Sequence, residues 1–150
     1  METDSLMNEL LSKSLFEEQT EFCTDAKLLS LRNWKIVIRS YPILEVEFLS
    51  SIRNNIRVRM NCDNWDESPP STVLLDDNDR PLREYPRGHG LFNNSPHPIF
   101  GRPFICSPGS LEYHQHQSHV NDLWDNYRGK TGYDLGGILT QIWNAWNESK

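Results

Sequence analysis

Residues 34–60, WKIVIRSYPILEVEFLSSIRNNIRVRM, decide the fold of this chain because apolar and other side chains alternate there in three short runs. The apolar positions are Trp34, Ile36 and Ile38, then Leu44, Val46 and Phe48, then Ile56, Val58 and Met60. Successive side chains of a strand point to opposite faces, so each run predicts a strand with one apolar face. Tyr41-Pro42 and Arg53-Asn54-Asn55 separate the runs and predict an antiparallel meander.

The residues after this meander predict a fourth strand and then a long loop. Pro69-Pro70 ends the hydrogen bonding of the third strand, and Val73-Leu74-Leu75 predicts a short fourth one. Residues 76–100 are rich in Asp, Asn, Pro, Gly and Arg. A long ordered loop inside a compact domain is more often functional than accidental.

Helices are needed to cover the apolar face of such a sheet. An N-terminal helix to about Glu18, capped by Asp4 or Ser5, is predicted by the spacing of Leu6, Met7, Leu10, Leu11 and Leu15. The change to strand periodicity is expected from Leu29. A short helix between the N-cap Ser118 and the stop Gly129 is predicted by Val120, Leu123, Trp124 and Tyr127. A final amphipathic helix is predicted by Leu135, Ile138, Leu139, Ile142 and Trp146.

Length and composition favour one folded α+β domain covering residues 1–150. Five Trp, five Tyr and six Phe supply large buried areas and argue against disorder. A formal charge of −6 gives no electrostatic footprint for nucleic acid or an anionic membrane. Three cysteines cannot all pair, no secretory signal is recognised and no apolar run suits a bilayer, so a cytoplasmic location is expected.

The residues with the most chemistry lie in segment 97–119, HPIFGRPFICSPGSLEYHQHQSH. If residues 111–117 are extended, Glu112, His114 and His116 share one face. The Pro and Gly of residues 107–110 favour a tight reversal, which brings the Cys106 thiol back over that face. A thiolate, a carboxylate and two imidazoles suit tetrahedral Zn²⁺. The segment therefore predicts a zinc site.

Alternatives stay open within this segment. His119, in the first turn of the next expected helix, competes with His116 as fourth ligand. A closed four-ligand site stabilises structure, whereas three ligands plus water permit hydrolysis with Glu112 as general base. A strand that is merely rich in His and Gln is the plainest interpretation. Cys23 and Cys62 are expected to be spectators or small buried residues, with Cys62 facing the core.

The order of these motifs resembles the ubiquitin-conjugating enzyme (UBC/RWD-like) fold. Residues 65–70 stand where that family has an aromatic and paired-proline turn, His97-Pro98 where it has its His-Pro-Asn turn, and Cys106 where it has the thioester-forming cysteine. The resemblance implies an N-terminal helix, a four-stranded antiparallel meander, a long loop and two C-terminal helices. Ile99 replaces the family's oxyanion-stabilising Asn, and Ser107 replaces the usual Leu.

Cys106, Glu112, His114 and a further His also resemble the signature of the bacterial CEHH predicted metal-binding domain. That resemblance implies a zinc-binding component of a bacterial ubiquitin-like conjugation pathway, in the setting of antiphage defence. Its partners would be a ubiquitin-like protein and an activating-enzyme-like or conjugating-enzyme-like protein. Two other functions remain open: a conjugating enzyme with Cys106 as nucleophile, and a non-catalytic RWD-type adaptor. A ligand and a nucleophile place competing demands on one sulfur.

Overall fold

The predicted meander is present as a four-stranded antiparallel sheet with the strand order β1-β2-β3-β4. The computed structural model describes residues 2–150, with side chains from Ser5 onward. The strands are β1 (Trp34–Ser40), β2 (Ile43–Phe48), β3 (Ile56–Asn61) and β4 (Ser71–Leu75). Both predicted turns fall between strands, and Pro69-Pro70 directly precedes β4. The α+β class and the four-stranded sheet are therefore confirmed.

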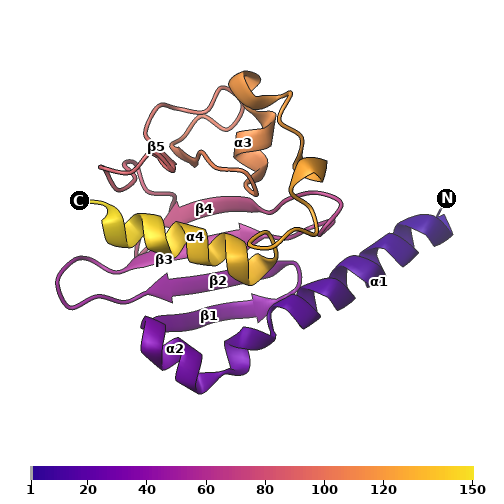
Figure 1. Cartoon of the computed structure of the whole chain (residues 1–150), viewed down its shortest axis with the longest axis horizontal. Helices are drawn as coiled ribbons and strands as arrows, with labels where there is room; N and C mark the ends of the chain where they lie inside the picture. The colour runs from indigo at the N-terminus through magenta and orange to yellow at the C-terminus, as the bar shows by residue number, and fades with distance from the viewer. Residues whose placement is uncertain (1) are drawn as a thin grey trace.

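The last helix, α4 (Leu135–Glu148), covers the apolar face of the sheet (Figure 1). Its buried residues are Leu135, Ile138, Leu139, Ile142, Ala145 and Trp146. They belong to one apolar cluster with Leu44, Val46 and Phe48 of β2. The Trp146 and Phe48 rings pack with centroids 5.6 Å apart. Cys62 is fully buried in the same cluster, as expected from the alternation along β3.

The alternation predicted for β1 is wrong beyond Ile36: a β-bulge changes the side of the sheet to which the following residues point. The pairing with β2 shifts between Ile36 and Ile38, so that Ile38 lies opposite Glu45 and Arg39 opposite Leu44. A bulge inserts one residue and reverses the alternation after it. Arg39 therefore reaches the end of α1, where its guanidinium donates to Thr20 Oγ1, directly after the helix, at 2.9 Å.

The N-terminal helix is confirmed as α1 (Glu2–Gln19), but the residues after it were predicted incorrectly. A 3-10 turn, η1 (Glu21–Thr24), and a second helix, α2 (Ala26–Arg32), occupy the place where strand periodicity was expected from Leu29. Asp25 caps α2 by accepting the Leu28 N–H at 3.1 Å. Asn33, with φ 55°, ends it. Asp25 is a sequence signal for the start of a helix, but the apolar pattern from Leu29 favoured a strand instead.

Glu45 is fully buried although it points away from α4. Arg57 Nε donates to its Oε2 at 3.0 Å, and Arg59 Nε donates to its Oε1 at 2.6 Å. Asp79, in the turn after β4, accepts from Arg57 at 2.6 Å. The charged face of the sheet thus contains a covered carboxylate held by two arginines.

Two further expectations for the second half of the chain are wrong. Residues 111–117 are not extended: Leu111–Gln115 form the short helix α3. The helix expected between Ser118 and Gly129 is absent, and two 3-10 turns, η2 (Gln117–His119) and η3 (Trp124–Asn126), stand there. The loop before them contains β5 (Phe92–Asn93), which pairs with β6 (Phe104–Ile105). No helix between residues 2 and 150 is long and apolar enough to cross a membrane.

Candidate functional site

Cys106 directly follows β6, and its backbone is held in place by a hydrogen bond. Its N–H donates to Leu91 O at 2.7 Å. The thiol is partly exposed and borders a cavity of about 450 Å³ between the 89–91 loop and α4. The predicted reversal after it is confirmed, because Ser110 N–H donates to Ser107 O at 3.1 Å across the turn. Cys106 thus presents a reachable sulfur from a fixed backbone.

Asn93 lies on β5, the strand paired with β6, and Cys106 directly follows β6. The Asn93 Oδ1 accepts the Ser95 N–H at 2.9 Å. Burial raises the pKa of the Cys106 thiol, and the Asn93 side chain lowers this pKa by a smaller amount. The Asn93 side chain is thus a neighbour of the thiol.

His119 lies on another side of the same sulfur, with 3.7 Å between Cys106 Sγ and His119 Nε2. Its ring stacks on Tyr113 with centroids 4.2 Å apart and planes inclined by 16°. The Tyr113 hydroxyl donates to Asp122 Oδ2 at 2.6 Å, and the Tyr127 hydroxyl donates to the same oxygen at 2.7 Å. These two hydroxyls lower the pKa of Asp122. The imidazole therefore rests on an anchored aromatic surface.

Glu112 does not share a face with His114, because residues two apart on a helix point in different directions, and His116 lies beyond the end of α3 in extended backbone. Its buried carboxylate accepts Ser71 Oγ–H at 2.7 Å, Thr72 N–H at 2.9 Å and Ser110 Oγ–H at 3.0 Å. Glu112 therefore ties α3 to the start of β4.

His114 is hydrogen-bonded through both ring nitrogens. Its Nδ1–H donates to Asp122 O at 2.7 Å, and its Nε2 accepts the Gly109 N–H at 3.1 Å. Burial lowers the pKa of His114, which agrees with a neutral ring. His116 stacks on Phe104 instead, with centroids 5.5 Å apart, and its Nδ1 accepts the Ser118 N–H at 3.1 Å. His114, His116 and His119 thus have three different environments.

The expected zinc ligands do not converge on one centre. Among the side chains of residues 5–150, no three His, Cys, Asp or Glu are grouped so as to hold a metal ion. Glu112 and His114 already use their polar atoms in hydrogen bonds to the protein, whereas the Cys106 sulfur lies 3.7 Å from His119 Nε2. The predicted set does not fit a metal ion in this conformation, so zinc binding stays a prediction.

The His97-Pro98 turn supports α3 and thereby the segment that carries His119. His97 is buried. Its Nε2–H donates to Glu112 O at 2.8 Å, while Nδ1 accepts the Ile99 N–H at 3.0 Å. This pattern of one donated and one accepted hydrogen bond requires the proton on Nε2 and none on Nδ1. His97 therefore has a structural role. Ile99 itself is 65% exposed.

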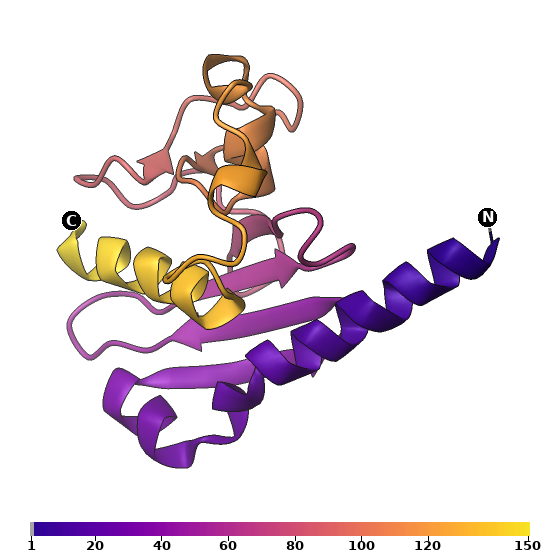
Figure 2. The same cartoon turned by 45° about the vertical axis from the view of Figure 1, so that its right-hand side comes forward.

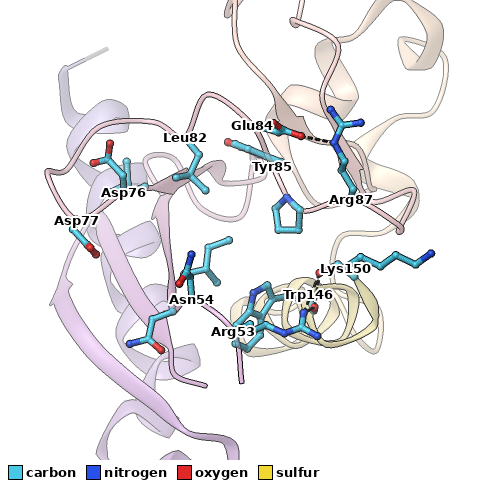
Figure 3. A pocket seen from close by; sticks show the side chains of 15 residues that line it. Arg53, Asn54, Asp76, Asp77, Leu82, Glu84, Tyr85, Arg87, Trp146 and Lys150 are labelled. Carbon is cyan, nitrogen blue, oxygen red and sulfur yellow. Dashed lines mark hydrogen bonds and ion pairs between the residues drawn. The ribbon is translucent and has the colours of Figure 1, made fainter. Parts of the chain in front are cut away.

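Another cavity, of about 750 Å³, lies beside the end of α4 (Figure 3). Its walls include Trp146, Tyr85 and Leu82. Arg53 donates to Ser149 Oγ at 3.2 Å and also binds the Trp146 carbonyl, so its head closes the end of α4. Arg87 is paired with Glu84 across the rim. None of the Cys106, His119 and Asn93 side chains lines this cavity. The Cys106 thiol therefore borders the smaller of these two cavities.

Asn93 is the site residue that sequence reasoning missed. Its only signal is its place in an Asn-Asn pair inside the long loop, a context that usually indicates a turn. Tyr113 and Asp122, which anchor His119, were not recognised as parts of the site either. Compared with family models and with curated protein sequences, the chain matches none.

Proposed function

We propose that the chain is a UBC-like enzyme that carries the C-terminus of a ubiquitin-like protein as a thioester on Cys106. The observation that supports this most is the partly exposed Cys106, whose sulfur lies 3.7 Å from His119 Nε2 and whose thiol pKa is lowered by the Asn93 side chain. A thiol, a base and a hydrogen-bond donor are the parts that acyl transfer requires. As in the resemblance stated above, the setting would be a bacterial ubiquitin-like conjugation pathway.

The arrangement of elements agrees with this proposal. A four-stranded meander is followed by a His-Pro turn, a cysteine beside a short strand, and a helix packed over the sheet. The His97-Pro98 turn is bonded to α3, which begins five residues after Cys106. These features support a UBC-like framework around the cysteine.

The cavity beside Cys106 suits an extended peptide tail. One wall contains Gly90, Leu91 and Ser107, and the other is the face of α4 formed by Gln141, Asn144, Ala145 and Glu148. Gln141 and Asn144 are three residues apart on one helix face, so two amide groups line the path of a peptide backbone. Gly90 and Ala145 leave room for small side chains near the thiol. A tail with small C-terminal residues therefore fits this groove.

The chemical step is a thioester exchange. His119 takes the proton of Cys106, the sulfur attacks the carbonyl carbon of the incoming thioester, and a new C–S bond forms. The activating enzyme's thiolate leaves when the old C–S bond breaks, and it receives the proton from His119. In this proposal the Asn93 amide, on the strand paired with β6, donates to the oxyanion that develops on the adjacent carbonyl oxygen. Asn93 would then supply the donor that Ile99 does not.

The proposed activity predicts a covalent adduct that depends on Cys106. Incubation with a cognate activating enzyme, ATP and the ubiquitin-like protein should give an adduct that thiol reductant removes. Cys106→Ala should abolish it, and Cys106→Ser should give a reductant-resistant ester. Cys23→Ala is the matched control and should retain the adduct. Electrophoresis with and without reductant measures each outcome. Absence of any adduct while the activating enzyme charges its own cysteine contradicts the proposal.

A zinc-ligand role for Cys106 makes the opposite prediction for thiol reactivity. In protein purified without chelator, we expect iodoacetamide to alkylate Cys106 at a rate that chelation does not change, because no metal holds the sulfur. Zinc ligation would protect the thiol until the metal is stripped and would give about one zinc per chain. Mass spectrometry of the alkylated peptide and metal analysis of the same sample decide between the two. Protection that chelator removes, and that His114→Ala also removes, would restore the zinc interpretation.

A further inference from the structure

A polar cavity of about 460 Å³, which we call the α1 cavity, lies between α1 and two turns of the sheet. Its lining residues are Ser5, Asn8, Glu9, Ser12, Tyr41, Asp63 and Asn64. The first four belong to α1, whereas Tyr41 lies in the turn from β1 to β2, and residues 63–64 follow β3. In both general views α1 runs past the end of the sheet at which β1 leads into β2 (Figures 1 and 2). The cavity thus joins three segments that are far apart in the sequence.

Packing and hydrogen bonds hold α1 beside the turn from β1 to β2. Phe16 is buried and packs against the Tyr41 ring with centroids 5.5 Å apart. Arg39 donates to Glu17 O at 3.0 Å and to Thr20 Oγ1 at 2.9 Å. These contacts fix the helix face that carries Ser12 next to Tyr41, so the α1 cavity has a defined shape.

Two hydroxyl groups in the wall of the α1 cavity have no hydrogen-bond partner. Ser12 is only 3% exposed, and its hydroxyl bonds to no atom of residues 5–150. The Tyr41 hydroxyl is buried and also has no partner among the side chains that the structure describes. Buried polar groups are normally hydrogen-bonded, because leaving one unsatisfied destabilises the fold. A ligand that donates to these hydroxyl oxygens would satisfy them.

The charge around the α1 cavity is negative. Glu9 and Asp63 are exposed and line it, whereas no Lys, Arg or His belongs to the lining. Lys13, one helical turn after Glu9, is not part of it either. Ionised carboxylates only accept hydrogen bonds. Two carboxylates near two hydroxyls without partners therefore favour a ligand that is a cation and a hydrogen-bond donor.

We propose that the α1 cavity binds a primary ammonium group on an aliphatic chain, the group that a lysine side chain or a free diamine carries. An ammonium group is a compact cation with three donors and no acceptor. The acceptors come from α1, from the Tyr41 turn and from the Asp63 turn, an arrangement that suits a tetrahedral donor better than a planar guanidinium.

A divalent metal ion fits the α1 cavity less well. Among the side chains of residues 5–150, no three His, Cys, Asp or Glu are grouped so as to hold a metal ion. Calcium takes about six to eight oxygen ligands and usually several carboxylates. The proposal does not rest on the thioester function, because neither Cys106 nor His119 lines this cavity.

Titration of the full chain with Nα-acetyl-lysinamide, followed by ¹H–¹⁵N NMR, tests this proposal. The amide signals of the lining residues should shift and saturate. The same probe acetylated on its ε-nitrogen has no charge and should cause no shift. Cadaverine is the second probe: tighter binding of cadaverine supports a free diamine as the ligand, and tighter binding of the lysine probe supports a protein side chain.

Charge-neutral variants locate the binding site. Glu9→Gln and Asp63→Asn preserve size, and each should weaken binding of the lysine probe about tenfold, because each removes a charge-assisted hydrogen bond. Ser12→Ala should weaken it by a smaller factor. Glu17→Gln is the matched control: it removes the same charge from an exposed glutamate of α1 outside the cavity, so the affinity should not change.

Four results would overturn the proposal. The first is equal weakening by Glu9→Gln and Glu17→Gln, which would reflect general attraction between charges. The second is equal binding of the ε-acetylated probe. The third is displacement of the lysine probe by an equal concentration of calcium, and the fourth is the absence of saturable shifts at millimolar concentrations of both amine probes.

Discussion

Replacing Glu112 by alanine is expected to lower the free energy of unfolding by about 3 kcal/mol. The change leaves the buried N–H of Thr72 without an acceptor, and an unsatisfied buried donor costs about 1–3 kcal/mol. It also removes the acceptor of the Ser71 and Ser110 hydroxyls and leaves a small cavity between α3 and β4. Urea denaturation monitored by circular dichroism measures the loss.

The conservative variant sharpens this test. Glu112→Gln keeps a carbonyl oxygen that accepts the Thr72 N–H, and its amide NH₂ can donate a hydrogen bond to the Ser71 hydroxyl oxygen. It should therefore retain more than half of the stability that the alanine variant loses. Glu18→Ala removes an exposed glutamate of α1 and should stay within about 0.5 kcal/mol of wild type. If Glu112→Ala were as stable as Glu18→Ala, the carboxylate would not tie α3 to β4.

Replacing Asn93 by alanine is expected to slow thioester formation on Cys106 about 100-fold, a prediction that rests on the proposed function. Loss of one oxyanion donor costs about 10²–10³ in rate in enzymes that stabilise such a charge. The same variant loses the side chain that lowers the pKa of the Cys106 thiol. The pH at which alkylation by iodoacetamide reaches half its maximal rate should therefore rise. Single-turnover charging measures the first effect.

Two further variants separate catalysis from folding at this position. Asn93→Asp preserves size but places a negative charge beside the sulfur, which disfavours the thiolate, so it should charge no faster than the alanine variant. Asn121→Ala removes an exposed asparagine outside the site and should charge at the wild-type rate. A charging rate for Asn93→Ala within threefold of wild type would assign the amide a purely structural role.

The sheet was predictable because its signal is local. Alternation along β2 and β3 requires only neighbouring residues, and the spacing of Leu135, Leu139 and Trp146 indicates a helix by itself. The bulge in β1 has no comparable signal. Its effect depends on the pairing with β2, which places Ile38 opposite Glu45.

The candidate site was only partly predictable because its arrangement depends on long-range contacts. Cys106 was recognised from residue type, and His119 was recognised only as the alternative to His116 as a zinc ligand. The alternation of Glu112, His114 and His116 resembles a strand, yet α3 forms because Glu112 bonds to Ser71 and Thr72, about 40 residues earlier. Asn93 reaches Cys106 only through the pairing of the two-residue strands β5 and β6, which are too short for periodicity to reveal.

The covered carboxylate of Glu45 restricts the sheet to one strand register. Slipping β2 by one residue would turn every side chain to the opposite face and move Glu45 into the apolar layer beneath α4. Arg57 and Arg59 would then no longer cover it. Burying an unpaired carboxylate costs several kcal/mol, more than the pair adds in the native register. Glu45 therefore acts mainly as a discriminator: it penalises misaligned sheets and so fixes the frame on which β4 and α3 are assembled.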